Sequence, residues 1–326
     1  MYGPDFTFLG IERCDLDKPE TYKDADVVIV GAPIDSGTSH RSGAKFGPQA
    51  IRMGDYLPHD GERPHLALRT DGLKDMKVVD AGDLLMNGGN LEDSLAILAE
   101  ATEKISRAGA IAVILGGDHS IASADVAGIA NHRGKGKISM VHFDAHADTG
   151  TDQWGALVGH GTPMRRLIEN GHVRGDRFLQ LGLRGYWPDD ATLNWMRDQG
   201  MRSYEMTEIH HRGLKAVLDE SFATLTDGCD GVFLSVDIDV VDPGMAPGTG
   251  TPEPGGMTSR ELLEAVRRIC LELPVVGVDI VEVAPPFDSA DITAILANRV
   301  VLEALSAIAL RKKGGSYSPT RNLLDR

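Results

Sequence analysis

Short apolar runs, rich in β-branched residues, alternate along the chain with longer segments in which apolar residues recur every three or four positions. Runs of the first kind predict buried strands, and segments of the second kind predict amphipathic helices. The predicted strands cover 26–33, 76–83, 110–118, 137–144, 177–185, 231–239 and 274–283. The predicted helices cover 91–109, 191–200, 213–228, 259–274 and 291–313.

This alternation predicts an α/β fold, a three-layer αβα sandwich whose central parallel sheet is covered by helices on both faces. The pattern contains no distinct linker, so we expect a single domain over 1–326, with its core at about 26–310. The Gly/Pro-rich stretch 242–256 follows a strand and precedes a helix, which is typical of a loop over the sheet edge. The polar, turn-rich tail 314–326 is expected to be a surface extension.

Charge and cysteine content narrow the class of protein. The net charge of −15, from 48 acidic and 33 basic residues, disfavours nucleic acid as a partner and favours cationic small molecules. Cys14, Cys229 and Cys270 are widely spaced and match no zinc or disulfide framework, which fits a reducing compartment. We find no basic leader before an apolar segment, and no apolar run near the roughly 20 residues of a membrane span. We therefore expect a cytoplasmic protein without a membrane partner.

The stretch MVHFDAHADT, residues 140–149, carries the first candidate chemistry. In an extended segment alternate residues face the same side, so Asp144, His146 and Asp148 are expected to converge. Two carboxylates and an imidazole held together in a buried place repel one another unless a cation lies between them. The stretch therefore predicts a cation site at the end of a strand.

Two other predicted strands end in similar side chains, which are His119 in ILGGDHS and Asp237 and Asp239 in SVDIDVVDP. Ligands of open α/β sheets collect at the carboxyl ends of the strands. Either motif alone is more often a hydrogen-bonded histidine or a solvated pair of aspartates, but three such strand ends together supply two imidazoles and four carboxylates. A catalytic zinc typically takes three protein ligands, so six suit two divalent ions that share carboxylates. Ligation rich in oxygen favours manganese, with nickel and cobalt as alternatives.

The motifs GGDHS, FDAHAD and SVDIDVVDP follow GAPIDSGTSHRSGAKFGPQAIR (31–52) and precede HGTP (160–163) and EVAP (282–285). In this order they resemble the ureohydrolase family, which includes arginase and agmatinase, from about residue 26 to 310. The resemblance implies the arginase-like fold and a dinuclear manganese site. It implies that one ion is held by His119, Asp144, Asp148 and Asp237, and the other by Asp144, His146, Asp237 and Asp239.

The resemblance also implies the reaction, which is hydrolysis of a guanidino compound to urea and an amine. Glu282 is expected to grip the guanidinium through a planar, bidentate pair of hydrogen bonds. His160 is the candidate proton shuttle, because imidazole titrates near neutrality. Asp148 is expected to pass a proton to the departing nitrogen. Family members are commonly trimers or hexamers, so the resemblance implies a homo-oligomer.

The choice of substrate depends on the loop 149–159, which is expected to line the mouth of the site around Trp154. Where arginase has an asparagine and a serine that help to hold the α-carboxylate of arginine, this chain has Gly150 and Ala156. Arginine is therefore a poor candidate, and agmatine, which yields putrescine and urea, is favoured. Alternatives are 4-guanidinobutyrate, 3-guanidinopropionate, a proclavaminate-type molecule and guanidine itself.

Two hypotheses from other functional classes are kept, in which the protein is a deacetylase-like hydrolase with a single zinc or a non-catalytic homologue. His142 is expected to pack or to contact a ligand residue from deeper in its strand. No role is predicted for four further histidines in polar contexts, which are His59, His65, His210 and His211. The segment RSGAKFGPQAIR, residues 41–52, lacks the spacing of a phosphate-binding loop and is expected to be a structural loop near the mouth of the site.

Overall fold

The computed structural model describes residues 6–55, 64–321 and 324. In this part of the chain eight strands form one parallel sheet in the order β2-β1-β3-β8-β7-β4-β5-β6. The strands are β1 Val27–Ala32, β2 Val78–Asp83, β3 Ile111–Gly116, β4 Ile138–Phe143, β5 Val173–Leu183, β6 Arg202–Glu205, β7 Gly231–Asp237 and β8 Val275–Val281. All seven predicted strands are present.

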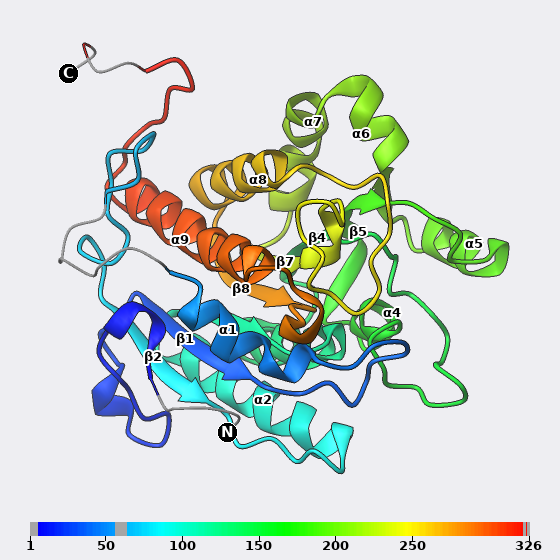
Figure 1. Ribbon diagram of the computed structural model, residues 1–326, viewed down its shortest axis with the longest axis horizontal. Helices are drawn as coiled ribbons and strands as arrows, with labels where there is room; N and C mark the ends of the chain where they lie inside the picture. Colours follow the sequence, from blue (N-terminus) through cyan, green and yellow to red (C-terminus); the bar gives the residue numbers. More distant parts are fainter. Residues whose placement is uncertain (1–5, 56–63, 322–323, 325–326) are drawn as a thin grey trace.

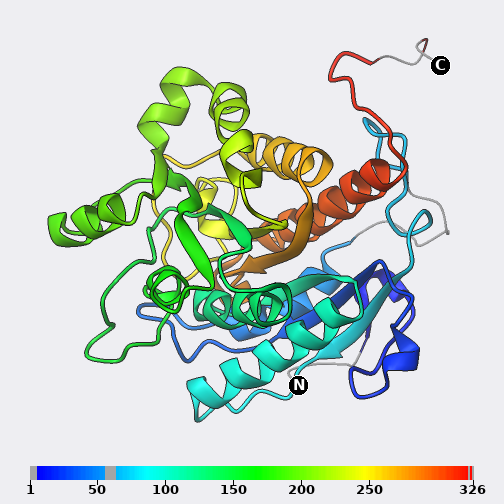
Figure 2. The same ribbon diagram turned by 180° about the vertical axis from the view of Figure 1, so that it is seen from behind.

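Side chains alternate along the strands and contribute to two hydrophobic cores, one on each face of the sheet. In β1, Val27 and Ile29 join the core on one face, whereas Val28 and Val30 join the core on the other. The first core is covered by α1 Gly47–Met53, α6 Met206–Arg212, α7 Leu214–Thr226, α8 Ser259–Glu272 and α9 Ile292–Lys312, with α8 and α9 in front in Figure 1. The second is covered by α2 Leu91–Arg107, α3 Ala122–Arg133 and α4 Pro163–Glu169, which face the viewer in Figure 2. The predicted three-layer αβα sandwich is confirmed.

The missed elements are short or lack an amphipathic pattern. Strand β6 has only four residues, RSYE, and pairs with β5 alone at the edge of the sheet. Helices α4 and α6 are seven residues each, and α3 is buried along most of its length, so it has no polar face to give a periodic signal. The short helix α5, Asp190–Asp198, was predicted.

The prediction of a loop over 41–52 is wrong for its second half, because α1 begins at Gly47 with a proline at its second position. Arg52 of this helix is buried and forms ion pairs with Asp80 and Asp83 of β2. Strand β2 is an edge strand, so these ion pairs hold helix α1 to the edge of the sheet.

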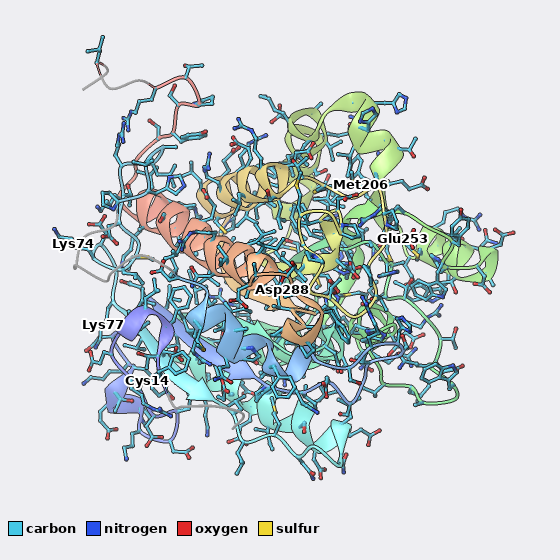
Figure 3. The ribbon with its side chains drawn as sticks, in the orientation of Figure 1. Cys14, Lys74, Lys77, Met206, Glu253 and Asp288 are labelled. Carbon is cyan, nitrogen blue, oxygen red and sulfur yellow. The ribbon has the colours of Figure 1, made fainter. Side chains whose placement is uncertain are left out.

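Helix α9 packs against α8 and α1 in its layer. The Asp288 carboxylate, labelled in Figure 3, accepts the backbone N–H groups of Thr293 and Ala294 in the first turn of α9. By length and composition α9 alone among the described helices could cross a membrane, contrary to the expectation that no apolar run is long enough. The most apolar part of this helix is 78% buried within the protein, which is how a core helix passes the same test.

The order of the strands sets the position of the site. Strands β3, β8, β7 and β4 are consecutive neighbours in the middle of the sheet, and all are parallel. Residues that follow these strands therefore meet at one edge. The loop 242–256 crosses this region as predicted, held where Val241 pairs with Met257. The described part of the tail, 314–321, is mostly exposed, as predicted for a surface extension.

Candidate active site

The predicted site residues follow the four central strands. His119 begins a 3-10 turn after β3, and Glu282 follows β8 directly. Asp148 and Glu282 have φ values of 51° and 62°, in the left-handed region that non-glycine residues rarely adopt. Such strain is found where surrounding contacts hold a side chain in a functional position. The remaining candidates are Asp144, His146 and Asp148 after β4, and Asp237 and Asp239 at the end of β7.

His119 lies at the centre of the first group. Its Nδ1 atom is 3.1 Å from one oxygen each of Asp144, Asp148 and Asp237. This buried nitrogen has no hydrogen-bond partner among the described residues, although three acceptor oxygens surround it. Burial opposes protonation, but the three carboxylates outweigh it and raise the pKa of His119 well above its usual value. A cation bound among these atoms would take the place of that proton.

His146 defines the second group. Its Nδ1 atom is 3.1 Å from Asp239 Oδ2 and 3.5 Å from Asp144 Oδ1. Asp144 therefore contributes one oxygen to the His119 group and the other to the His146 group. A carboxylate with one oxygen directed at each of two neighbouring sites has the form of a bridging ligand. The structure thus brings together all six side chains that the sequence singled out as metal ligands.

The electrostatics of these groups are unfavourable without a cation. Burial, together with the charges of Asp239 and Asp144, raises the pKa of Asp237 well above its usual range. Burial and Asp144 also raise the pKa of Asp239. Burial opposes ionisation of Asp144 too, but the three histidines around it, His119, His142 and His146, outweigh burial and hold the pKa of Asp144 well below its usual value. Two divalent cations would offset four carboxylates, so the donor set fits a dinuclear metal centre.

His142 supports this site from deeper in β4, as predicted. Its Nε2 atom is 2.8 Å from Asp144 Oδ2, and its Nδ1 atom accepts a hydrogen bond of 3.1 Å from the Gln180 amide. Because Nδ1 accepts, the ring proton is on Nε2 and is donated to Asp144. His142 therefore orients a carboxylate. Sequence analysis did not single out Gln180, an inward-facing residue of β5 with no motif around it.

His160 contacts both Glu282 and Ser39 through its ring nitrogens. Its Nδ1 atom is 2.9 Å from Glu282 Oε1, and its Nε2 atom is 3.0 Å from the backbone nitrogen and 2.6 Å from Oγ of Ser39. Burial lowers the pKa of His160, but Glu282 outweighs it and raises the pKa to about 9. The Ser39 N–H donates to neutral Nε2, whereas Ser39 Oγ is able to accept a hydrogen bond from Nε2–H of the charged ring. Ser39 therefore serves both protonation states of His160.

Glu282 differs in one respect from the sequence-based expectation. Its Oε1 atom accepts both His160 Nδ1–H and the backbone N–H of His119, each at 2.9 Å, so its lone pairs are occupied. Oε2 is buried and has no hydrogen-bond partner among the described residues. The expected bidentate grip is therefore not available in this arrangement, and Oε2 alone is free to accept. Burial raises the pKa of Glu282, but His160 outweighs it, so the pKa is lowered and the group is a carboxylate.

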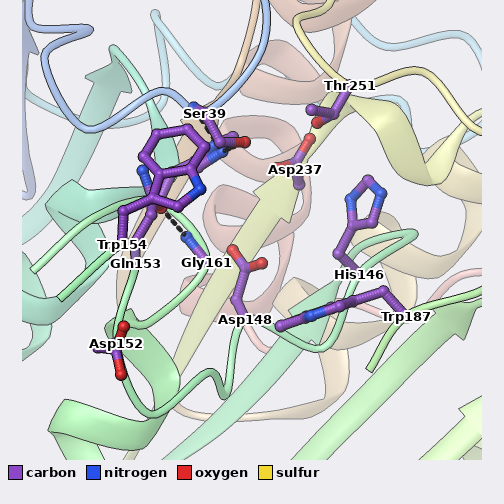
Figure 4. Close-up of a pocket in the computed structure, with 11 residues that line it drawn as sticks. Ser39, His146, Asp148, Asp152, Gln153, Trp154, Gly161, Trp187, Asp237 and Thr251 are labelled. Atoms are coloured by element: carbon purple, nitrogen blue, oxygen red, sulfur yellow. Dashed lines mark hydrogen bonds between the residues drawn. The ribbon is translucent and has the colours of Figure 1, made fainter. Parts of the chain in front are cut away.

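A cavity of about 370 Å³ opens beside these groups. Figure 4 shows Asp148 and Asp237 pointing into it, with the indole rings of Trp154 and Trp187 on different sides. The expected contribution of loop 149–159 to the mouth is confirmed. The lining residues are Ser39, His146, Asp148, Asp152, Gln153, Trp154, His160, Gly161, Trp187, Asp237 and Thr251.

Three of the four histidines for which no role was predicted are described. His65 bonds Glu303 of α9, and His211 bonds a backbone carbonyl of its own helix. The rings of His210 and His211 lie edge to face at the surface. His59 lies outside the described residues. Cys14, Cys229 and Cys270 are free thiols.

The parallel sheet and the His/Asp groups at its central strand ends define an α/β enzyme with a dinuclear-type metal centre. The model of the arginase family matches residues 25–307. The chain belongs to the arginase family, and the predicted class, a hydrolase that acts on linear amidines, is confirmed at the level of that family.

Two relatives and one solved structure show the spread within this family. The chain is 37% identical to a guanidinobutyrase of Pseudomonas aeruginosa over 87% of this chain and 86% of the relative. It is 39% identical to a mitochondrial agmatinase of Gallus gallus over 87% of this chain and 81% of the relative. The structure of proclavaminate amidino hydrolase from Streptomyces clavuligerus superposes with a TM-score of 0.82 at 34% identity, over 95% of this chain and 99% of that one. These names cover several guanidino substrates.

Proposed function

We propose that the protein hydrolyses agmatine to urea and putrescine. The observation that carries this choice is the charge of the cavity. Its lining includes the carboxylate of Asp152 and the indoles of Trp154 and Trp187, and among its described lining residues there is no Lys or Arg. Agmatine has a second cation at the end opposite to its guanidinium. Such a cation is attracted by a carboxylate and by aromatic faces.

Two divalent cations would be held by the six side chains of the His119 and His146 groups, which are His119, Asp144, His146, Asp148, Asp237 and Asp239. Manganese is favoured by the four carboxylates, with nickel or cobalt as alternatives. Two bound cations would supply Lewis acidity and would lower the pKa of a water molecule, so that it attacks as hydroxide at neutral pH.

The chain's own residues position the substrate and move its protons. Glu282 Oε2, free of other partners among the described residues, accepts an N–H of the guanidinium. Asp148 lines the cavity and takes a proton from the attacking water for transfer to the departing nitrogen. His160 lies at the same cavity wall and exchanges protons at Nε2 with the amine product. Ser39 holds that nitrogen in place through its contacts of 3.0 and 2.6 Å.

The alternative substrates fit this cavity less well. The guanidino acids carry a carboxylate where agmatine carries an ammonium, and Asp152 would repel it. Arginine requires a partner for its α-carboxylate, and Gly150 leaves no room for one, because a side chain there would meet the Gly161 carbonyl oxygen at 2.9 Å. Guanidine lacks the chain that would reach Trp154.

The test is urea release from agmatine, 4-guanidinobutyrate, 3-guanidinopropionate, arginine and guanidine by metal-stripped protein reloaded with manganese, nickel, cobalt or zinc. We expect the highest kcat/KM for agmatine with manganese and two bound ions per chain. A guanidino acid as the best substrate would refute the reading of the cavity charge. A single bound zinc per chain would favour the deacetylase-like class, and binding of no divalent ion would favour a non-catalytic homologue.

We also propose that the protein is a cytoplasmic homo-oligomer, a trimer or a hexamer. Three free thiols support a reducing compartment. The oligomer rests on the family to which the chain belongs. Light scattering coupled to size-exclusion chromatography, and fractionation of cells that express the protein, test the two statements.

A further inference from the structure

One side chain of the exposed stretch 151–157 is hydrogen-bonded to two other segments of the chain. Gln153 is half-buried, whereas all its neighbours in this stretch are exposed. Its amide nitrogen donates to the Gly37 carbonyl oxygen at 2.8 Å. Its amide oxygen accepts the N–H of Gly161 at 3.3 Å (Figure 4). Only this orientation of the amide pairs a donor with an acceptor at both ends, so both polar atoms of Gln153 are used by the backbone.

The two segments that Gln153 joins are the ones that hold His160. The Gly37 carbonyl oxygen also accepts the backbone N–H of His160 at 3.0 Å. Ser39, two residues after Gly37, contacts Nε2 of the His160 ring through its N–H and its hydroxyl group. Gly161 directly follows His160 in the chain. The Gln153 amide therefore ties the segment that contacts the imidazole to the segment that carries it.

The surroundings of the amide fit this role. A side chain at Gly159 would meet the amide oxygen of Gln153 at 2.5 Å, so the glycine leaves the space that the amide occupies. The backbone of Gln153 is fixed as well, because it pairs with Ala156 through hydrogen bonds of 2.8 and 3.0 Å. This pairing closes a tight turn in which Trp154 and Gly155 have φ values of 53° and 86°. Gln153 thus starts from a rigid base and has a space shaped for its side chain.

We propose that Gln153 is a positioning residue for proton transfer: its amide ties together two backbone segments and so fixes the imidazole of His160 against Glu282. Without the amide, the N–H of Gly161 loses its acceptor and the Gly37 carbonyl oxygen loses one of its two donors. The imidazole is then expected to occupy its productive position for less of the time. The inference rests on the proposed function, in which His160 exchanges protons with the amine product.

A direct contact with the substrate is the alternative role, because Gln153 also lines the cavity. The two roles affect different kinetic constants. Loss of a substrate contact raises KM, whereas displacement of the proton shuttle lowers kcat. Displacement of the shuttle also makes turnover depend on a proton carrier in the buffer, which loss of a substrate contact does not.

The kinetic experiment uses manganese-loaded protein and the guanidino compound that the wild type hydrolyses fastest, which we expect to be agmatine. Gln153→Met keeps the length of the side chain but has neither the amide N–H nor the amide oxygen. We expect its kcat to fall about tenfold, with KM within about twofold of the wild type. Imidazole added to the buffer should raise the kcat of this variant at least about threefold and leave the wild-type kcat unchanged. Gln199→Met, at a half-buried glutamine after α5 and outside the cavity, is the matched control and should keep the wild-type constants.

A double variant shows whether Gln153 acts through His160. If it does, Gln153→Met/His160→Gln turns over no more slowly than His160→Gln alone. Additive losses, a raised KM with an unchanged kcat, or a lowered kcat that imidazole does not raise would each overturn the proposal.

Amide hydrogen exchange tests the same contacts without substrate. We expect peptides that cover 35–40 and 159–162 to exchange about tenfold faster in Gln153→Met than in the wild type, with the strands unchanged. Unchanged exchange in these peptides would refute the positioning role whether or not the proposed function holds. Wild-type protein that releases urea from no guanidino compound would refute the proposed function, and hydrogen exchange would still decide whether Gln153 holds the His160 segment.

Discussion

His160 and the backbone N–H of His119 share a single oxygen atom, Oε1 of Glu282, at 2.9 Å each. One carboxylate oxygen thus links the candidate proton shuttle to the turn that carries a candidate metal ligand. The other oxygen, Oε2, has no hydrogen-bond partner among the described residues. A substitution of Glu282 is therefore expected to affect substrate binding, the position of His160 and the turn that carries His119. A substitution of His160 is expected to affect proton transfer alone.

The His160–Glu282 pair makes the stability of the metal-free protein depend on pH. The pKa of His160 is about 9 in the folded protein, against an ordinary value of 6.5 that we take for the unfolded chain. The protonated ring therefore contributes stability that is fully present below pH 6.5 and is lost as the pH rises through 9, about 3 kcal/mol in all. The free energy of unfolding, measured by urea denaturation of the metal-free protein, should be higher for the wild type than for His160→Gln. We expect this difference to be larger at pH 6 than at pH 9.5. A gap that does not change with pH would contradict the assignment.

Replacing Glu282 tests its role in substrate binding. Glu282→Gln keeps the size of the side chain but removes the charge that faces His160 and that is proposed to bind the guanidinium. We expect kcat/KM for agmatine to fall by at least about 100-fold, in the range found when a positioned charged group is removed from an active site. Manganese content should stay at two per chain, because Glu282 is not one of the proposed ligands. A variant that loses its metal would show that Glu282 acts through the His119 turn instead.

The sequence predicted the parts of this molecule that have a repeating or clustered signal. Buried parallel strands are continuous apolar runs, so all seven longer strands were found. The alternation of Asp144, His146 and Asp148 picked out the right residues, but the extended segment it assumed is not present. Strand β4 ends at Phe143, the chain bends at 145–146, and Asp148 has a φ of 51°. Since parallel strands end at the same edge, the other ligand candidates could be assigned to the same site from the sequence alone.

The rest of the site depends on contacts between segments that are distant in sequence. Ser39 meets His160 across 121 positions, and Gln180 meets His142 across 38. The direction of a hydrogen bond, such as the one that fills Oε1 of Glu282, is likewise fixed only by the folded geometry. The fold and the ligands could be predicted from the sequence, but their supporting contacts could not.

Arginine activity should not be gained by restoring the two residues that arginase has. A side chain at Gly150 would meet the Gly161 carbonyl oxygen at 2.9 Å and Trp187 at 3.5 Å, and the Gly150 N–H also bonds that carbonyl. We expect Gly150→Asn/Ala156→Ser to hydrolyse agmatine at least about tenfold more slowly, because the mouth of the cavity is displaced. Arginine should remain a poor substrate. Ala156→Ser alone, at an exposed position, is the control and should retain activity.

Asp152 should select for a positive charge at the far end of the substrate. Asp152→Asn is expected to raise KM for agmatine about threefold, the range of an exposed charge pair, and to leave kcat unchanged. KM for 4-guanidinobutyrate should stay the same or fall. Added salt should shrink the difference between wild type and variant, because it screens exposed charges. Asp17→Asn, an exposed change outside the cavity, is the matched control. If Asp152→Asn raised KM for 4-guanidinobutyrate more than KM for agmatine, the prediction would be contradicted.

Removing one carboxylate of the His146 group should empty one metal position and leave the other. Asp239 Oδ2 lies 3.1 Å from His146 Nδ1, whereas its Oδ1 accepts the N–H of Ala145, a bond that asparagine keeps. In Asp239→Asn we therefore expect a folded protein with one manganese per chain instead of two, measured by elemental analysis after desalting. Activity should fall at least about 100-fold, since both ions are needed to activate the water and to offset the developing charge. Asp242→Asn, whose carboxylate bonds the N–H groups of the nearby loop, is the matched control and should keep both ions. Two ions in Asp239→Asn would place the second site elsewhere.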